Sequence, residues 1–408
     1  MAEERKQPEL RFKGFTDDWI QDKLGNLANF SKGKGYSKND LVSSGFQILL
    51  YGSLYTNYKI EISETNTYVS DDTGAVKSKG HEVVVPSSGE TPDEIARASA
   101  ITSKDIIIGG DLNIVLPPFQ LNSIFLAVVL TFGKSQKELR KRAQGATITH
   151  LRNSDLTHVL VSYPTRKEQD IITLFLKRLD KIITLEQKKI EKLELLKQYL
   201  LQNMFADKSG YPKIRFTNFN NEWSQDKLED VADVRDGTHD SPKYLSEGVP
   251  LITSKNVGNG KINYNDINYI SLDDYKKINN RSKVDINDIL MGMIGTIGNL
   301  ALIHTEPAFA IKNVALIKDT QQIFYLFLYY YLHCPFITKQ LRINLDGGTQ
   351  KFISLKKIRN LLIRTTNSVE QEKIGNCFNT LDSLITLEKT KLDKIQILKQ
   401  KFLSSLFI

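Results

Sequence analysis

Residues 168–205 read EQDIITLFLKRLDKIITLEQKKIEKLELLKQYLLQNMF, and residues 370–407 read EQEKIGNCFNTLDSLITLEKTKLDKIQILKQKFLSSLF. The two stretches align without a gap at an offset of 202 residues, and 16 of the 38 positions are identical. A match of this length indicates an internal repeat rather than a coincidence of composition. The chain is therefore expected to contain two related halves.

Both copies have the pattern of a long amphipathic helix, because apolar residues recur at steps of three and four. Thr165 with Glu168, and Asn367 with Glu370, predict a capping box at each helix start. Gly210 predicts the end of the first helix. Each helix would be about 55 Å long. The expected partner for each apolar stripe is the other copy, in an antiparallel coiled coil, although each helix could instead pack on its own globular neighbour.

Two further segments recur in both halves. Residues 8–24, PELRFKGFTDDWIQDKL, return as residues 212–228, PKIRFTNFNNEWSQDKL, so the two tryptophans of the chain, Trp19 and Trp223, form a matched pair. Each is expected to anchor a small apolar cluster. A segment containing Gly-x-Thr precedes each long helix, with Thr147 aligned to Thr349.

The regions between these repeated segments, about 25–144 and 229–346, show no convincing similarity to each other. Apolar runs at 81–86, 106–116 and 288–303 predict strands, and short helices are expected near 123–131 and 323–339. We interpret each region as a compact α/β (α+β) unit with a mostly antiparallel or barrel-like sheet. The expected domains are two recognition heads, 1–164 and 208–366, and two long helices, 165–207 and 367–408.

Composition limits the possible functions. The 408-residue chain carries a net charge of +8, which makes nucleic acid a plausible partner, although charge alone decides nothing. Cys334 and Cys377 are the only cysteines, which argues against a disulfide framework or a cysteine zinc site. The N-terminus lacks the apolar core of a signal peptide, and no apolar run is long enough for a bilayer. We expect a cytoplasmic protein.

A repeated frame that carries two different inserts suggests one task performed on two targets. Duplex DNA suits such a chain, because two sites on the same face of the duplex lie about 34 Å apart. This order of segments resembles the DNA specificity subunit of type I restriction-modification enzymes over the whole chain. The stretches 236–257 and 288–303 resemble target-recognition segments of that family.

The resemblance implies a non-catalytic subunit with a pseudo-two-fold repeat that binds a two-part double-stranded DNA sequence with a fixed unread gap. It also implies that two modification subunits, which methylate adenine, and further restriction subunits bind the chain. S-adenosylmethionine, ATP and Mg would belong to those partners, and no cofactor to this chain. The alternative from another class is a coiled-coil scaffold whose two heads bind proteins.

Candidate DNA contacts are hydroxyl, amide, aromatic and basic side chains in glycine-punctuated loops and beside the two Gly-x-Thr segments, because such groups suit phosphates and base edges. Taken singly, each residue could belong to an ordinary solvated turn. The candidates are Lys32, Lys34, Tyr36, Tyr51, Tyr55, Asn57, Tyr58, Ser87, Ser88, Thr91, Lys141, Arg142, Thr147, Arg235, Thr238, His239, Ser241, Lys243, Ser254, Lys255, Asn256, Thr349 and Lys351.

Catalysis has little support in the sequence. Pro117-Pro118-Phe119 resembles part of an amino-methyltransferase motif, but Leu116 stands where that motif needs an Asn or Asp side chain. The chain has no glycine-rich cofactor loop between a strand and a helix. The six histidines lack metal-ligand spacing, so neither a catalytic residue nor a metal ligand is predicted.

Overall fold

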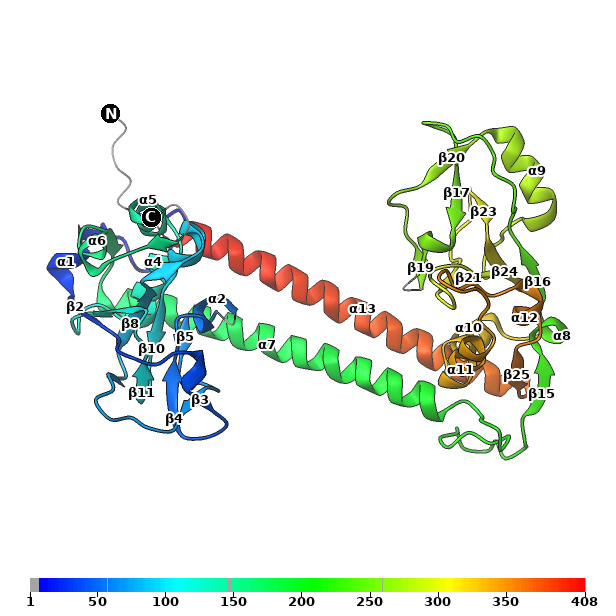
Figure 1. Cartoon of the computed structure of the whole chain (residues 1–408), viewed down its shortest axis with the longest axis horizontal. Coiled ribbons are helices and arrows are strands. Elements are labelled where there is room, and N and C mark those ends of the chain that lie inside the picture. The colour runs from blue at the N-terminus through cyan, green and yellow to red at the C-terminus, as the bar shows by residue number, and fades with distance from the viewer. Residues whose placement is uncertain (1–6, 57, 146–147, 259, 408) are drawn as a thin grey trace. The chain divides into compact units, whose positions relative to one another are not determined.

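The computed structural model describes residues 7–56, 58–145, 148–258 and 260–407. It divides into two units (Figure 1). Unit 1 comprises Met1–Glu186 together with Lys391–Ile408, and unit 2 comprises Gln187–Thr390. None of the described helices is both long enough and apolar enough to cross a membrane.

Unit 1 contains two five-stranded sheets that are mostly antiparallel, as expected. The first has the order β2 (Asn29–Lys32), β12 (Leu112–Leu116), β8 (Glu82–Pro86), β10 (Ser99–Ile101) and β5 (Glu61–Ile62), and only β10 and β5 are parallel. The second has the order β3 (Leu41–Val42), β6 (Tyr68–Val69), β4 (Phe46–Leu49), β11 (Lys104–Ile108) and β7 (Lys77–Lys79), and only β4 and β11 are parallel. Two antiparallel pairs complete the strands: β1 (Ile20–Lys23) with β14 (Leu160–Tyr163), and β9 (Ser88–Gly89) with β13 (Thr149–His150).

Unit 1 also contains short helices. They are α1 (Leu24–Leu27), η1 (Lys38–Asp40), α2 (Ser53–Thr56), α3 (Pro92–Ile95), α4 (Ser123–Thr131), α5 (Lys134–Arg142) and α6 (Asn153–Leu156). Helix α4 is apolar almost all round and packs on β8 and β10, which is why nearly all of it is buried. Trp19 is buried against Phe125 and Phe407, which confirms its expected anchoring role.

Unit 2 has a four-stranded and a three-stranded sheet. The first has the order β16 (Asp233–Asp236), β24 (Val314–Lys318), β21 (Ile289–Gly292) and β22 (Leu300–Leu302), all antiparallel. The second has the order β20 (Asn268–Ile270), β17 (Val249–Thr253) and β23 (Ala310–Lys312), with β17 and β23 parallel. Two antiparallel pairs are β15 (Ser224–Lys227) with β25 (Leu362–Thr365), and β18 (Val257–Gly258) with β19 (Lys261–Ile262).

The short helices of unit 2 are α8 (Leu228–Val231), η2 (Ser254–Asn256), α9 (Leu272–Ser282), α10 (Tyr325–Leu332), α11 (Pro335–Ile343) and α12 (Leu355–Arg359). The helical region expected near 323–339 consists of two helices, α10 and α11. Pro335 occupies the first turn of α11, where its missing N–H costs nothing, whereas inside a continuous helix it would break a hydrogen bond. Trp223 is buried against Phe327, as expected.

The two dissimilar regions share one strand order. β2-β12-β8-β10 in unit 1 corresponds to β16-β24-β21-β22 in unit 2, and β6-β4-β11 corresponds to β20-β17-β23. Single hydrogen bonds agree as well: the Gly33 amide donates to the Leu112 carbonyl at 2.9 Å, and the Gly237 amide to the Val314 carbonyl at 3.0 Å. The two inserts are therefore copies of one α/β architecture with different side chains.

The long helices are α7 (Arg166–Asn203) and α13 (Ser368–Ser405), each of 38 residues. They run antiparallel within each unit. In unit 1, Lys391 binds Glu186 at 2.5 Å and the ring of Phe175 contacts that of Phe402, with centroids 4.8 Å apart. In unit 2, ion pairs at 2.5 Å join the helices, namely Lys189 with Glu388 and Lys197 with Asp382.

Only one of the four bonds expected from the two predicted capping boxes occurs among the described residues. The Asn367 side chain accepts the Glu370 amide at 3.0 Å, as a cap should. The two glutamates do not reach back to the cap. Arg11 donates to both carboxylate oxygens of Glu168, and Arg215 does the same for Glu370. A bidentate guanidinium is a stronger partner for a buried carboxylate than one backbone amide.

Candidate nucleic-acid interface

The loop that follows β16 is fixed to the turn between β23 and β24. The Thr238 amide donates to the Ile311 carbonyl at 3.0 Å, and the Asn313 amide donates to the Thr238 carbonyl at 3.2 Å. Gly237 makes this approach possible, because a Cβ atom there would lie 2.3 Å from the Ile311 carbonyl oxygen. The side chains at 238–241 are thereby presented at the end of the sheet.

The loop that follows β2 in unit 1 is built in the same way. The Lys34 amide donates to the Ile108 carbonyl at 3.1 Å, and the Gly110 amide donates to the Gly35 carbonyl at 2.9 Å. A Cβ atom on Gly33 would lie 2.0 Å from the Gly109 carbonyl oxygen. Two of the predicted contact loops, 32–36 and 236–241, thus occupy equivalent positions.

The segments that follow β4 and β17 support the next loop in each unit. In unit 1 the Tyr55 hydroxyl donates to the Ser88 carbonyl at 2.5 Å, and burial raises the pKa of Tyr55. In unit 2 the Ser254 hydroxyl accepts the Met293 amide at 3.0 Å and the Ile294 amide at 3.3 Å. Both contacts fix the segment that leaves the central strand of the sheet.

Antiparallel backbone pairs flank the Gly-x-Thr segments and lie beside those loops. The Gln144 amide donates to the His150 carbonyl at 3.1 Å, and the Asp346 amide donates to the Phe352 carbonyl at 2.8 Å. His150 pairs with Ser88, and Phe352 with Ile294. Gly145, Thr349 and Lys351 are exposed there, whereas Thr147 lies outside the described residues.

Four equivalent segments, most of which contain predicted residues, therefore make up one candidate surface in each unit. We define surface 1 as the loop 32–36, helix α2, the segment 87–89 and the described residues 144–145 and 148–150. Surface 2 is the loop 236–241, helix η2, the segment 293–294 and the turn 346–352. The bonds given above fix each loop to its sheet and join the other three segments, which are distant in sequence, to one another. Each surface combines polar, basic and aromatic side chains, as a nucleic-acid interface requires.

Surface 2 contains a polar network around His239. The ring nitrogens of His239 lie 2.8 Å from the Asn313 side-chain oxygen and 2.8 Å from the Asp236 carboxylate. These two hydrogen bonds, first that with Asn313 and then that with Asp236, raise the pKa of His239 above its usual value. Arg281 of α9 also binds Asp236, which is buried. The network holds the loop against α9.

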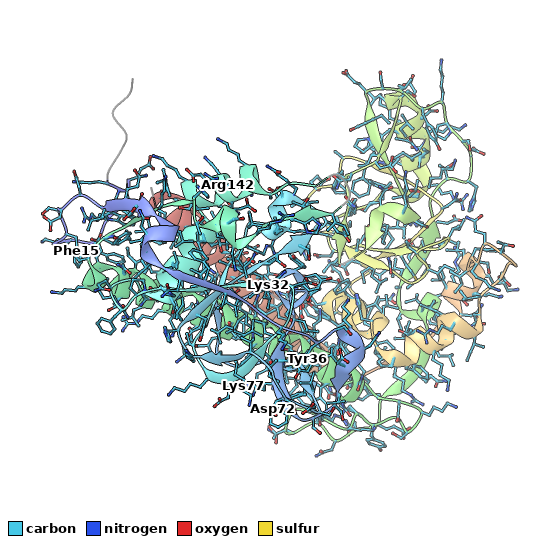
Figure 2. All side chains as sticks on the ribbon, turned by 60° about the vertical axis from the view of Figure 1, so that its left-hand side comes forward. Phe15, Lys32, Tyr36, Asp72, Lys77 and Arg142 are labelled. Carbon is cyan, nitrogen blue, oxygen red and sulfur yellow. The ribbon has the colours of Figure 1, made fainter. Side chains whose placement is uncertain are left out.

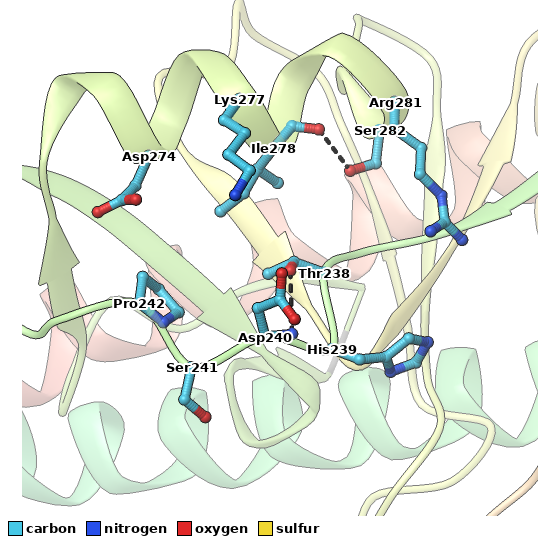
Figure 3. A pocket seen from close by; sticks show the side chains of 10 residues that line it. All are labelled: Thr238, His239, Asp240, Ser241, Pro242, Asp274, Lys277, Ile278, Arg281 and Ser282. Atoms are coloured by element: carbon cyan, nitrogen blue, oxygen red, sulfur yellow. Dashed lines mark hydrogen bonds between the residues drawn. The ribbon is translucent and has the colours of Figure 1, made fainter.

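An open pocket of about 490 Å³ lies between this loop and α9 (Figure 3). Figure 3 shows Thr238, His239 and Ser241 along the loop, with Lys277 and Arg281 on the facing helix. The mixture of hydroxyl, imidazole and cationic groups offers hydrogen-bond donors toward solvent, which phosphate and base edges accept.

Lys312 is a basic residue of this surface that the sequence did not indicate. Its ammonium donates to the Ser241 hydroxyl at 2.7 Å and lies 5.9 Å from the centre of the Tyr244 ring. Asn313, His150, Ile294 and Phe352 were also missed. They lie in apolar or apparently structural stretches, and only the register between the two units brings them to the surfaces.

Several candidates in unit 1 are exposed at or near surface 1. In the view of Figure 2, Lys32 lies between Arg142 and Tyr36. Lys34 and Tyr51 are exposed, and Tyr51 packs edge-on against Tyr55. Asn57 lies outside the described residues.

Three of the remaining candidates have individual partners. Arg235 binds Asp233, Lys255 binds Asp266, and the Arg142 guanidinium donates to the His158 carbonyl. Lys141 and Lys243 are exposed.

Five candidates have internal roles, and we revise their prediction from DNA contact to support of the loops. The Tyr58 hydroxyl donates to the Ala98 carbonyl at 3.0 Å, and burial raises its pKa to about 12. Ser254 and Asn256 are buried and bond to neighbouring backbone, and Ser87 is buried as well. Thr91 caps α3. Hydroxyl and amide groups suit DNA and tight loops equally, so composition alone could not separate these roles.

The duplicated chain thus has two equivalent surfaces, one in each unit, with one architecture and different side chains. The model of the type I restriction modification DNA specificity domain matches residues 16–195 and 220–396. The chain belongs to this family, which makes it a DNA-specificity component of a type I system rather than an enzyme.

Relatives of known name agree with this assignment. The MjaVIII specificity subunit of Methanocaldococcus jannaschii is 25% identical over 302 residues, covering 70% of this chain and 71% of the relative. The EcoBI specificity subunit of Escherichia coli is 23% identical over 349 residues, covering 74% and 73%. Among solved structures, the S subunit from M. genitalium has a TM-score of 0.58 at 18% identity and covers 98% of this chain and 99% of that one. The HsdS subunit from Thermoanaerobacter tengcongensis has a TM-score of 0.53 at 15% identity, with 95% and 96% coverage.

Proposed function

We propose that this chain recognises a two-part DNA sequence with a fixed unread gap, one half through surface 1 and the other through surface 2. The observation that carries the proposal is the shared hydrogen-bond frame of the two surfaces, which presents different side chains in each. Base recognition depends on which side chains reach the groove, so one frame with two side-chain sets suits two different half-sites.

The long helices would set the length of the gap, as a pseudo-two-fold coiled-coil pair. They would also bind two adenine-methylating modification subunits. In support, α7 and α13 keep large apolar side chains exposed, such as Leu195 at 56%, Leu387 at 63% and Ile397 at 69%. Exposed apolar residues in such number are typical of a protein-binding surface. Restriction subunits would join this complex.

The chemistry of such a complex would belong to its other subunits. S-adenosylmethionine would serve the modification subunits, and ATP with Mg the restriction subunits. In the described part of the chain, no cluster of three His, Cys, Asp or Glu side chains could hold a metal ion.

The test is a methylation map of DNA from cells that express this chain with its cognate modification subunit. Methyladenine should occur at one two-part sequence with a constant gap. Replacing residues 25–144 with the corresponding region of a relative should change one half of that sequence and leave the other half and the gap intact. If the replacement changes both halves or neither, the assignment of one half-site to each surface is wrong.

A further inference from the structure

The two surfaces differ most in polarity at one equivalent place. The Leu151 amide donates to the Ser87 carbonyl at 3.0 Å, and the Ile353 amide donates to the Met293 carbonyl at 2.9 Å. The next pair in register is His150 with Ser88 in unit 1 and Phe352 with Ile294 in unit 2. The backbone is therefore the same, but serine, serine and histidine in unit 1 stand where unit 2 has methionine, isoleucine and phenylalanine.

In unit 2 these apolar side chains line an open pocket of about 490 Å³. Met293, Ile294, Phe352 and Leu355 form apolar walls, and the His239–Asn313 pair closes one side. Phe352 is 40% exposed, so it faces the solvent rather than filling the core. An exposed apolar pocket beside polar side chains suits an occupant that presents an apolar group to it.

The surroundings of the pocket favour a nucleic-acid occupant. Lys356 lies on the rim, and the exposed Lys351 directly precedes Phe352 in the chain. Cations beside an apolar pocket match a base edge that is flanked by phosphates. Thymine is the base whose major-groove edge carries an apolar group, its 5-methyl.

We propose that the pocket of Met293, Ile294, Phe352 and Leu355 receives the 5-methyl group of one thymine in the half-site that surface 2 recognises. The inference rests on the proposed function and names the base that this part of the surface distinguishes. The equivalent place in surface 1, with Ser88 and His150, offers hydrogen-bonding groups instead. No methyl discrimination is expected at that place in surface 1.

The test is a deoxyuridine scan. Each thymine of both half-sites is replaced singly by deoxyuridine, which lacks only the methyl group. Binding of the full chain, assembled with its modification subunit, is then measured by fluorescence anisotropy. One position in the half-site of surface 2 should bind about three- to fivefold more weakly, the effect of losing one buried methyl.

A double variant makes the corresponding change in the protein. Ile294→Ser with Phe352→His places the unit 1 side chains on the unit 2 backbone. It should bind the thymine and the deoxyuridine duplex equally, at the affinity of the native chain for deoxyuridine. Tyr264→Ala, which removes an exposed aromatic ring elsewhere in unit 2, should keep the full difference.

Specific binding of both half-sites without any deoxyuridine effect in the half-site of surface 2 would overturn the inference. A half-site that contains no thymine would also overturn it, and so would a methyl effect that persists in the double variant. If the double variant loses the modification subunit instead, the pocket binds protein. Failure to bind any specific sequence would refute the proposed function itself. The methylation map would reveal that failure before the scan begins.

Discussion

At the scale of single residues, the Glu-Gln pair that starts each long helix joins distant parts of its unit. Glu168 accepts two hydrogen bonds from Arg11, at 2.8 and 2.9 Å, and Gln169 accepts the Asn122 amide at 2.8 Å. In unit 2, Glu370 and Gln371 repeat these contacts with Arg215 and the Phe324 amide. These repeated residues therefore hold each long helix to the head of its unit.

Breaking one of these Arg–Glu ion pairs should destabilise its unit strongly. Arg215→Met leaves the fully buried Glu370 carboxylate without its guanidinium, at an expected cost of about 3 kcal/mol. Lys227→Ala, which breaks an exposed ion pair with Glu229, should cost less than about 1 kcal/mol. Urea unfolding followed by circular dichroism measures both. If the two variants shift the urea midpoint equally, the ion pair of Arg215 with Glu370 has no special structural role.

The imidazole of His239 should make the stability of unit 2 depend on pH. Its pKa in the folded state is raised, first by the hydrogen bond with Asn313 and then by that with Asp236. The stabilisation is therefore fully present below the unfolded-state pKa of about 6.5, and it disappears as the pH rises through the folded-state pKa. The expected direction is a loss of stability on raising the pH.

Nuclear magnetic resonance titration of the histidine ring measures this pKa directly. Asp236→Asn removes a negative acceptor and should lower the pKa of His239. His239→Asn identifies the resonance and should remove this part of the pH dependence of unfolding. A titration of His239 at or below the usual histidine value in the native chain would show that the network does not hold an imidazolium.

At the scale of elements, the apolar periodicity was sufficient to predict the long helices, because each pattern extends over ten turns. The strands at 82–86 and 112–116 were also predicted from their apolar runs. The shared topology of the two inserts could not be predicted from the sequence. It is specified by backbone hydrogen bonds, which form with almost any side chain. Gly33 and Gly237 have the same structural role in the two inserts. One matched pair of glycines is too little sequence similarity to align the two regions.

The same argument explains why the sequence indicated only part of the two surfaces. Loops 32–36 and 236–241 were predicted, because glycine and hydroxyl residues mark loops. Ile294 and Phe352 were not predicted, because apolar residues suggest a core until the register places them beside an open pocket. Ser254 is buried, and its residue type alone could not distinguish a serine that supports a turn from one on the surface.

Close packing at the two glycines should be essential for both loops. Gly237→Ala would place a Cβ atom 2.3 Å from a backbone oxygen, so the loop must move. It should weaken binding to the half-site of surface 2 by more than about tenfold, roughly 1.4 kcal/mol, and leave recognition of the other half unchanged. Gly33→Ala should have the reciprocal effect.

Gly52→Ala is the matched control for these variants, because nothing lies within 4 Å of a Cβ atom there. It should leave recognition of both half-sites unaltered. Substitutions scanned across each half-site in a competition binding assay separate the two outcomes. If Gly33→Ala and Gly237→Ala impair the same half-site, surfaces 1 and 2 do not act on separate halves.

At the scale of the whole molecule, the internal repeat indicated a two-headed chain, and the match of the specificity family to both halves agrees with it. The repeat could not show which of its residues are scaffold and which are surface. That distinction depends on contacts such as Arg11 with Glu168, whose partners lie 157 residues apart.

The measurement that tests the central claim most directly is a methylation map for a chain with lengthened helices. Seven residues are inserted into α7 after Lys188 and seven into α13 after Glu388, beside the ion pair of Lys189 with Glu388. A whole heptad keeps the apolar stripes in register and adds about 10 Å. The methylated sequence should keep both halves while its gap grows by about three base pairs. An unchanged gap, or altered half-sites, would contradict the claim that the helix pair separates two independent recognition surfaces.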